Sequence, residues 1–248
     1  MGGWNGDEQA CPTRYNEACQ TRGEGRLRRL ISAIIFDMDG LMFDTEALNM
    51  KGWIEVGKRH GYAMTEDVVF GHIGANLATT RRLMTEHFGP GFDFDAVRAD
   101  RVAWTFAHIE RNGMPEKPGL RELLVWLRAN GLKTAIATSS ERRFVDFYMA
   151  HADLGHPFDT IVTGDRVTRS KPEPDIFLKA AEELGAAPAD CVVLEDSYNG
   201  IRAAHAAGMR PVMVPDLLPP TPEVEPLLYR RADSLSDVIP ILEALRHA

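Results

Sequence analysis

Residues 34–40 read Ile-Ile-Phe-Asp-Met-Asp-Gly, an apolar run that leads directly into two carboxylates one residue apart. The apolar or small residues from Ser32 to Phe36 are typical of a buried strand in a parallel sheet, and this strand ends where the charges begin. Asp37 is therefore expected at the carboxyl end of the strand, which is the edge where open α/β sheets bind ligands. Because two acids this close repel each other, either a cation lies between Asp37 and Asp39 or one of them keeps its proton.

The composition narrows the class of protein to which this strand belongs. A chain of 248 residues with 44% hydrophobic residues can form one large domain or one domain with an insert. It has no apolar run near the roughly 20 residues that span a bilayer and no secretory signal pattern, so we expect a cytoplasmic protein with no membrane partner. The three cysteines show no metal-ligand spacing. A net charge of −8 argues against a nucleic-acid partner, which needs a basic face.

Three segments of the chain differ in their sequence pattern. Residues 1–30 show no periodicity and are interpreted as a disordered leader. Residues 45–116 show helical spacing of apolar residues without strand-like alternation, which predicts an all-helical insert. Pro115, Pro118 and Gly119 suit a linker at the return from this insert. The remaining residues, 31–44 and 117–248, are assigned to the core domain.

Short apolar runs alternate with helical patterns along the second half of the chain. Strands are expected at residues 134–137, 160–163, 191–194 and 211–214, and helices near residues 120–130, 174–184, 199–207 and 236–247. Strands that are separated by helices imply right-handed crossovers and a parallel sheet. The predicted fold class is α/β, with a Rossmann-like three-layer α/β/α core and a small all-helical domain.

Polar side chains follow one predicted strand after another, or come just before a helix. They are Asp37, Asp39, Thr138, Ser139, Lys171, Glu195 and Asp196. Alone, each has a structural explanation as a turn, a helix cap, a surface lysine or an ordinary loop. Because parallel strands end at one edge of a sheet, we expect these side chains to meet there, which favours a catalytic site.

The two aspartates that follow the first strand suit covalent and proton-transfer chemistry. An aspartate carboxylate can act as a nucleophile and form an aspartyl-phosphate, and Asp37 is the candidate. The leaving oxygen then needs a proton, and the water that attacks later must lose one. A second carboxylate two residues along the chain, Asp39, can do both.

The other polar groups suit the binding of a metal ion and a phosphoryl group. Mg²⁺ prefers carboxylate, water and phosphate oxygens, so it would bridge Asp37, Asp196 and a phosphoryl oxygen. The charge of a transferring phosphoryl group is spread over its equatorial oxygens. Lys171, the Thr138 hydroxyl and backbone N–H groups at a helix start near Ser139 would stabilise that charge.

With these residues in this order, the sequence resembles the haloacid dehalogenase superfamily of phosphatases and phosphomutases over about residues 32–214. The family pattern is a hydrophobic strand with Asp-x-Asp, a strand with Thr or Ser, a lysine and an acidic pair, and all four are present. The insert after the first motif resembles the mobile cap of the β-phosphoglucomutase-like group. So does the acidic pair Glu195-Asp196 followed by Ser197, Asn199 and Gly200.

This resemblance implies a role for each matched residue. Asp37 would be the nucleophile and a ligand of Mg²⁺, and Asp39 the general acid/base and a backbone ligand of the same ion. Asp196, with Glu195 beside it, would complete the acidic metal site. Thr138, Ser139 and Lys171 would hold the transferring phosphate.

The family pattern also bears on the choice of reaction. Dehalogenases of the superfamily lack an acid at the position of Asp39 and carbon–phosphorus hydrolases usually do, so both chemistries are disfavoured. The histidine on the first cap helix of β-phosphoglucomutase would align with Asn49, and residues 71–76 lack the arginine that grips its second phosphate. These departures favour a Mg²⁺-dependent phosphatase of a small phosphomonoester, either a sugar phosphate or a nucleotide-derived monophosphate. A phosphosugar mutase remains the alternative.

Specificity is expected to come from the cap, since closure of a cap excludes water and completes a site. The candidates are Glu46, Asn49, Trp53, His72 and Asn76. Residues 207–216 resemble pseudouridine-5′-phosphatases but lie away from the cap and do not fix the substrate. The expected partner is a small phosphorylated metabolite, and the chain is expected to be a monomer or a weak homo-oligomer. A catalytically inactive binding module is a further alternative, because fold does not fix function.

Overall fold

The computed structural model describes residues 31–71 and 77–247, so the expected leader at residues 1–30 lies outside the described residues. The described part forms a six-stranded parallel sheet with the order β3-β2-β1-β4-β5-β6. Its strands are β1 (Ala33–Phe36), β2 (Lys133–Ala137), β3 (Thr160–Val162), β4 (Cys191–Glu195), β5 (Arg210–Met213) and β6 (Arg230–Arg231). The expected α/β fold with a parallel sheet is confirmed.

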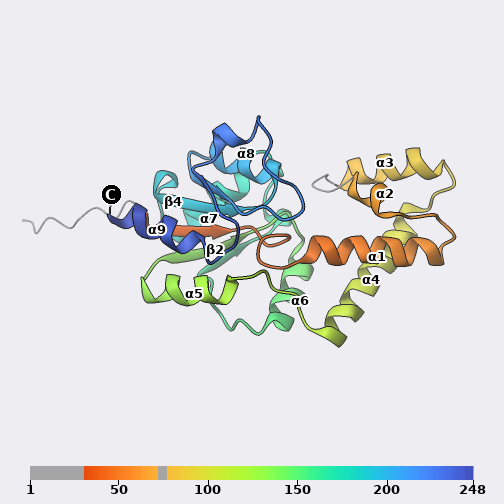
Figure 1. The fold of residues 1–248 in the computed structure, drawn as a ribbon, viewed down its shortest axis with the longest axis horizontal. Helices are drawn as coiled ribbons and strands as arrows, with labels where there is room; N and C mark the ends of the chain where they lie inside the picture. The colour runs from red at the N-terminus through yellow and green to blue at the C-terminus, as the bar shows by residue number, and fades with distance from the viewer. Residues whose placement is uncertain (1–30, 72–76, 248) are drawn as a thin grey trace, which may run out of the picture.

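Helices cover both faces of the sheet and also form a separate unit (Figure 1). The core helices are α5 (Leu120–Ala129), α6 (Arg142–Ala152), α7 (Asp175–Leu184), α8 (Tyr198–Ala206) and α9 (Val238–His247). The helices inserted between β1 and α5 are α1 (Thr45–Arg59), α2 (Glu66–Phe70), α3 (Leu77–Phe88) and α4 (Phe94–Asn112).

Alternation along the strands produces the three layers. Ile34 and Phe36 of β1 pack on one face of the sheet in a cluster with α5, α6 and α9. Ala33 and Ile35 point to the opposite face, where they pack with α7 and α8. Successive side chains of a strand point to opposite faces, so a strand buried on both faces has to be apolar throughout. Every residue of β1 is buried, as that rule requires.

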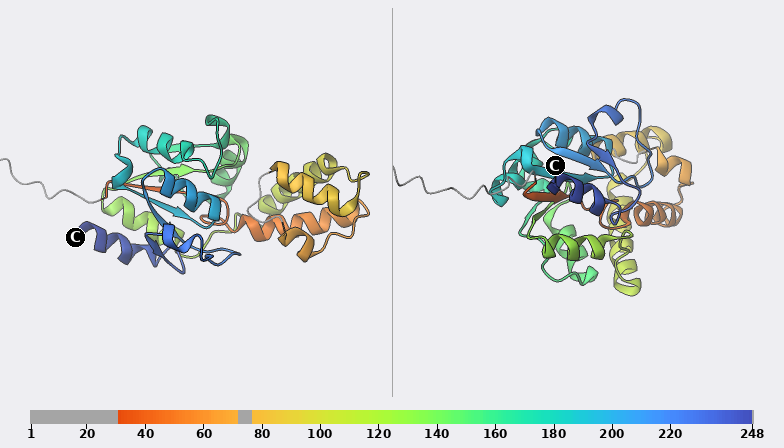
Figure 2. Two further views of the ribbon diagram at one scale, coloured as in Figure 1. Left: turned by 90° about the horizontal axis from the view of Figure 1, so that it is seen from above. Right: turned by 60° about the vertical axis from the view of Figure 1, so that its left-hand side comes forward.

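The inserted helices have a hydrophobic core of their own. Trp53, Val56, Met84 and Val97 are among its buried members, and no residue of the sheet belongs to this cluster. Figure 2 shows these helices at the far end of the molecule from the C-terminus, next to the carboxyl edge of the strands. The predicted all-helical insert therefore forms a compact unit beside the sheet. Among the described residues, no helix is long and apolar enough to cross a membrane.

Two chain segments connect the helical unit to the sheet, and they run side by side. The Asp44 N–H donates to the Pro115 carbonyl over 2.9 Å, and the Lys117 N–H donates to the Met42 carbonyl over 2.9 Å. The Lys117 ammonium also lies 2.6 Å from a carboxylate oxygen of Asp216, in the loop after β5. This pair fixes the returning segment to the core.

A second contact between the unit and the core is aromatic. Phe106 of α4 stacks on Phe147 of α6 with ring centroids 3.9 Å apart and ring planes 9° apart. Stacked and edge-to-face aromatic pairs contribute beyond the area that they bury. The long helix α4 is thus attached to the core through its second half.

The structure differs from the sequence-based expectations at two places. The helix expected to begin near Ser139 begins at Arg142, with Glu141 in extended backbone before it. Strand β6 was not expected, because two exposed arginines carry no apolar signal; it is held by backbone pairing with β5. The ends of the other strands differ from the expected ends by about one residue, which is ordinary for strand boundaries.

Candidate active site

The site lies at the carboxyl edge of the sheet, where β1 and β4 are neighbours. Phe36 is opposite Leu194 in this pair, and the Asp37 N–H donates to the Leu194 carbonyl over 3.0 Å. The register therefore places Asp37 beside Glu195, the last residue of β4. The chain runs from β1 toward β2 on one side and returns to β4 on the other, which makes this the switch point where doubly wound sheets bind ligands.

The Lys171 ammonium joins the two strands at this edge. It lies 2.5 Å from Asp37 Oδ1 and 2.6 Å from Glu195 Oε1, and it also donates to the Ala137 carbonyl over 3.2 Å. An ammonium has three protons, so these contacts use all of them. Its side chain is 6% exposed and lies over the ring of Phe177 at 4.9 Å. Lys171 is thus a buried cation in direct contact with the candidate nucleophile.

Burial is the largest single influence on the pKa values of Asp37, Lys171 and Asp196. It raises the pKa of Asp37 to about 8, with Glu195 and Asp39 adding to the rise and Lys171 opposing it. Burial also opposes the charged form of Lys171, but the carboxylates of Asp37 and Glu195 outweigh it and raise the pKa of the ammonium. Burial, followed by Glu195 and Asp37, holds the pKa of Asp196 well above its ordinary value. The positive charge of one lysine therefore does not neutralise the negative charges that these neighbouring acids would carry.

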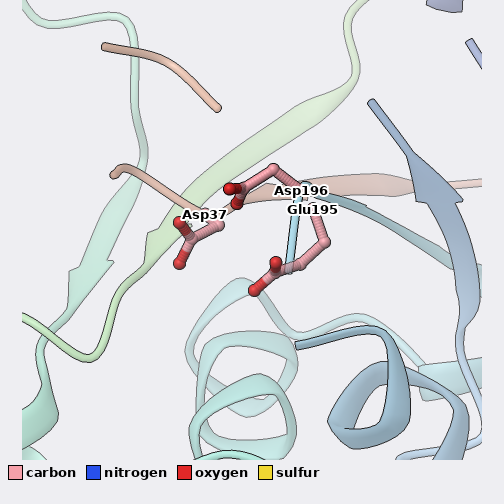
Figure 3. A group of neighbouring side chains, drawn as sticks. All are labelled: Asp37, Glu195 and Asp196. Carbon is pink, nitrogen blue, oxygen red and sulfur yellow. The ribbon is translucent and has the colours of Figure 1, made fainter. Parts of the chain in front are cut away.

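Three of these acids are arranged so that they could hold a metal ion. One carboxylate oxygen from each of Asp37, Glu195 and Asp196 lies within 4.8 Å of the others. In Figure 3 the Asp196 side chain extends toward Asp37, and the Glu195 side chain turns to the opposite side from that of Asp196. A divalent cation prefers such oxygen ligands and would relieve the crowding of charge. The residues thus fit the metal that the sequence predicts.

Glu195 already has hydrogen-bond partners for both of its oxygens. Oε1 accepts from Lys171, and Oε2 accepts from the Ser197 N–H and the Ser197 hydroxyl, each over 2.9 Å. Its side chain is fully buried against Gly200, where an added Cβ would overlap the carboxylate. Of the three acids, Asp37 and Asp196 are therefore the better candidates for metal ligands. Glu195 chiefly orients Lys171.

Hydroxyl groups from two segments hold the second aspartate of the first motif. Asp39 Oδ1 accepts from Thr45 Oγ1 over 2.9 Å, at the start of α1. Asp39 Oδ2 accepts from Ser140 Oγ over 2.7 Å and from Thr138 Oγ1 over 3.4 Å. Asp39 thus connects the loop after β1 with the loop after β2.

Thr138 and Ser139, the two phosphate-binding candidates in the loop after β2, differ in their positions in the structure. Thr138 is buried, contacts Asp39, and accepts from the Ser140 N–H over 3.0 Å. Ser139 is exposed, while Ser140, which the sequence analysis did not single out, makes the strong contact with Asp39. Because three hydroxyls follow the strand in a row, sequence alone could not tell which of them turns inward.

Three of the expected specificity residues lie on one face of α1. Glu46, Asn49 and Trp53 are spaced by three and four residues, and all are at least half buried. Burial raises the pKa of Glu46 to about 7, and Asp39 and Asp216 add to the rise while Arg101 opposes it. The other two candidates, His72 and Asn76, lie outside the described residues.

Two further features of the site had no signal in the sequence. Arg101 of α4 donates to Asn49 Oδ1 and lies over the ring of Trp53 at 5.3 Å. Asp216 binds Lys117 with one oxygen, and its other oxygen is buried without a hydrogen-bond partner among the described residues. Both depend on contacts between segments far apart in the chain, so only the folded structure brings them into view.

Comparison with known proteins agrees with this geometry. The family model for haloacid dehalogenase-like hydrolases matches residues 34–214. The chain belongs to this family. It is 33% identical over 189 residues to the phosphorylated carbohydrates phosphatase of Thermotoga maritima, covering 72% of this chain and 82% of that protein. It is 32% identical to the fructose-1-phosphate phosphatase of Escherichia coli over 183 residues, covering 74% and 96%.

A solved structure extends the agreement in fold. The β-phosphoglucomutase from Clostridium difficile superimposes with a TM-score of 0.70 and covers 88% of this chain and 97% of its own. Its sequence is 22% identical to this chain, so the likeness shows the fold alone. The expected resemblance to the haloacid dehalogenase superfamily is confirmed.

The packing of Glu195 against Gly200 leads to a prediction about stability. In a helix, alanine is favoured over glycine by about 1 kcal/mol. At position 200 of α8 the new Cβ would overlap the buried Glu195 carboxylate, so Gly200→Ala should lower the free energy of unfolding, by roughly 2 kcal/mol.

Urea unfolding of both proteins measures this change. The matched control is Gly91→Ala, where an added Cβ meets nothing within 4 Å. A Gly200→Ala protein that is as stable as the parent, or more stable, would contradict the packing of Glu195 against α8.

Proposed function

We propose that this chain is a Mg²⁺-dependent phosphatase that hydrolyses a small phosphomonoester through an aspartyl-phosphate on Asp37. One observation supports the proposal above all others. The buried Lys171 ammonium lies 2.5 Å from Asp37 Oδ1 at the switch point of the sheet, and Asp196 extends toward the same carboxylate. A nucleophilic carboxylate beside a fixed cation and a metal site suits phosphoryl transfer, in which positioning and positive charge provide most of the catalysis.

In the first step an oxygen of Asp37 forms a bond to phosphorus, and the bond from phosphorus to the leaving oxygen breaks. Asp39 gives its proton to the leaving oxygen, which departs as an alcohol. Thr45 and Ser140 hold the Asp39 carboxylate in one orientation for this transfer. The products of the step are the free alcohol, the aspartyl-phosphate and ionised Asp39.

In the second step water attacks the phosphorus of the aspartyl-phosphate. The new oxygen–phosphorus bond forms while the bond to Asp37 breaks, and ionised Asp39 takes the proton from the water. Lys171 stays beside Asp37 throughout and stabilises the negative charge of the transferring group. Asp37 and Asp196 would hold Mg²⁺, which would supply further positive charge to the phosphoryl group.

The substrate class that we propose is a sugar phosphate or a nucleotide-derived monophosphate. The names of two relatives, which refer to phosphorylated carbohydrates and to fructose 1-phosphate, support the first of these. A phosphosugar mutase is the alternative, since the fold is shared with a β-phosphoglucomutase. A mutase of the β-phosphoglucomutase type would carry a histidine at the position of Asn49. Here Asn49 binds Arg101 instead, which favours hydrolysis.

Phosphate release is the test of this function, and Asp37 is the residue to change. The parent should release phosphate from one or more members of a panel of sugar phosphates, nucleoside monophosphates and p-nitrophenyl phosphate when Mg²⁺ is present. Asp37→Asn should abolish release and leave the circular dichroism spectrum unchanged, because the amide cannot attack phosphorus. The control is Asp233→Asn, whose side chain is 84% exposed.

Three results would count against parts of this function. Release by purified Asp37→Asn would exclude Asp37 as nucleophile. Isomerisation of β-glucose 1-phosphate that is faster than release would establish the mutase. A parent protein that is folded but turns over no ester would favour the inactive binding module.

Metal binding should depend on pH in a defined direction. In the metal-free protein the raised pKa values of Asp37 and Asp196 mean that their neutral forms stabilise the fold. The contribution of Asp37 is present below the ordinary pKa of an aspartic acid, near 4, and is lost as the pH rises through about 8. The contribution of Asp196 has the same sign and is likewise lost as the pH rises through its raised pKa. Mg²⁺ binds the ionised carboxylates, so it competes with protons at low pH and replaces the lost stability at high pH.

Melting temperatures with Mg²⁺ and with EDTA test this dependence. At about pH 8.5, Mg²⁺ at 100 times its Kd at that pH should stabilise the protein by roughly 2.7 kcal/mol. The same concentration of Mg²⁺ at about pH 5.5 should stabilise it by much less, because protons compete for the carboxylates. Asp196→Asn should remove most of the difference at high pH. An equal effect of Mg²⁺ at both pH values, or none at either, would contradict a metal site formed by these acids.

A further inference from the structure

We propose that Asp216, in the loop after β5, is a positioning residue for the metal site. Its Oδ2 accepts a hydrogen bond from a water molecule on the Mg²⁺ that Asp37 and Asp196 hold, and Lys117 fixes its Oδ1. The proposal rests on the phosphatase function above and adds to the site a residue outside the sequence motifs. Three features of the structure support it.

The first feature is the place of Asp216 at the carboxyl edge of the sheet. Glu195 is opposite Met213 in the pairing of β4 with β5, and the Val214 N–H donates to the Glu195 carbonyl over 2.8 Å. The loop after β5 therefore leaves the sheet beside Asp196, the residue that follows β4. Asp216 thus follows its strand in the same way as the predicted site residues follow theirs, at the edge where such sheets bind ligands.

The second feature is that Asp196 and Asp216 point to the same place, next to Gly40 in the loop after β1. Gly40 has a φ of +80°, and a Cβ added to it would lie 2.4 Å from Asp196 Oδ2 and 3.3 Å from Asp216 Oδ2. A glycine both adopts this backbone conformation and leaves the space that the two carboxylates occupy. Like charges this close repel each other unless a cation or a proton donor lies beside them. A metal ion on Asp196, with its bound water, would supply both.

The third feature is that one oxygen of Asp216 has a partner and the other has none. Oδ1 lies 2.6 Å from the Lys117 ammonium, and the Lys117 backbone is itself bonded to Met42. Oδ2 is buried without a hydrogen-bond partner among the described residues, and the whole Asp216 side chain is 6% exposed. A buried carboxylate oxygen without a donor is costly, and such atoms in folded proteins normally have a partner. An O–H donor bound in the site would satisfy Oδ2.

The arrangement of the acids favours a water molecule between the metal ion and Asp216 over a direct bond. The acids with oxygens within 4.8 Å of one another are Asp37, Glu195 and Asp196, and among the described residues Asp216 does not belong to this group. Mg²⁺ takes octahedral oxygen ligands and usually keeps several waters among them. Carboxylates that hydrogen-bond to the ligands of a metal ion orient those ligands and raise the affinity for the metal. Asp216 Oδ2 is placed to do this for a water on the side of Gly40.

Asp216→Asn tests the proposal, because the amide keeps an oxygen for Lys117 and puts a donor in place of the accepting Oδ2. The Kd of Mg²⁺, measured by isothermal titration calorimetry on the full chain at about pH 8.5, should rise roughly 10- to 100-fold, the usual effect of losing such a partner. In EDTA the melting temperature should not fall, because the amide can donate to the Asp196 carboxylate. A residue that only ties its loop to Lys117 would show the opposite pattern, a lower melting temperature with an unchanged Kd.

Glu46→Gln is the matched control for the loss of a negative charge. Burial is the largest cause of the raised pKa of Asp196, and Glu46 adds more to the rise than Asp216 does. Burial raises the pKa of Glu46 itself to about 7, so this side chain is ionised at about pH 8.5. If charge alone mattered, Glu46→Gln would weaken Mg²⁺ binding at least as much as Asp216→Asn. We expect a much smaller effect, because the proposed hydrogen bond belongs to Asp216.

A crystal structure of the unchanged protein with Mg²⁺ and inorganic phosphate gives a test that depends on no variant. A water molecule bound to Mg²⁺ should lie within about 3 Å of Asp216 Oδ2, the length of an O–H···O hydrogen bond. A direct bond from Asp216 to Mg²⁺, or bound waters that all point away from Oδ2, would overturn the proposal.

The outcomes distinguish this proposal from the function on which it rests. A Kd that is unchanged in Asp216→Asn, or raised equally in Glu46→Gln, would overturn the role of Asp216 and leave the phosphatase intact. A parent that binds no Mg²⁺ would overturn the metal site, and the role of Asp216 with it. A parent that binds Mg²⁺ but hydrolyses no ester would overturn the phosphatase, and the Kd values would still decide the role of Asp216.

Discussion

The site depends on one buried ammonium between two carboxylates. Lys171 contacts Asp37 and Glu195 at 2.5 Å and 2.6 Å. Asp37 directly follows β1, and Glu195 is the last residue of the neighbouring strand β4. Breaking a buried charged pair by removing one partner is far more costly than breaking a surface pair, because the remaining charge has no water around it. Lys171 therefore fixes the separation of β1 and β4 at their carboxyl ends, and with it the position of Asp37, the proposed nucleophile.

The fold brings this cation to the acids through the order of its strands. Because β1 lies between β2 and β4, the loops after all three strands meet at one edge. The loop after β2 supplies Thr138 and Ser140 to Asp39, and the loop before α7 supplies Lys171. The helical unit is inserted directly after the first motif, so α1 begins with Thr45 in contact with Asp39. The two candidate catalytic aspartates, Asp37 and Asp39, are thus adjacent to both parts of the molecule.

Much of the core could be predicted from the sequence because its strands are buried on both faces. The runs at 33–36 and 191–194 are apolar or small, and an acid follows each of them. The polar residues that follow the strands are of the types that phosphoryl transfer and metal binding require. The order Asp37, Thr138, Lys171 and Asp196 then suffices to expect a phosphoryl-transfer site.

The rest could not be predicted because it depends on which way a side chain turns. Ser139 and Ser140 are chemically the same and adjacent, yet only Ser140 contacts Asp39. The sequence predicts Asp196 as a metal ligand with Glu195 beside it, but it does not show that Glu195 turns toward α8 and contacts Lys171. Arg101 has no motif at all, since its meaning comes from Asn49 and Trp53 on another helix.

In the proposed reaction, Lys171 and the metal site prepare Asp37 for covalent attack. The direct test is to quench the enzyme with acid during turnover of its best substrate and to locate the phosphoryl group by peptide mass spectrometry. We expect a phosphoryl group on Asp37, on the peptide that contains residues 34–40, and none on that peptide before substrate is added. Turnover with no phosphoryl group on Asp37, or with one on another residue, would contradict it.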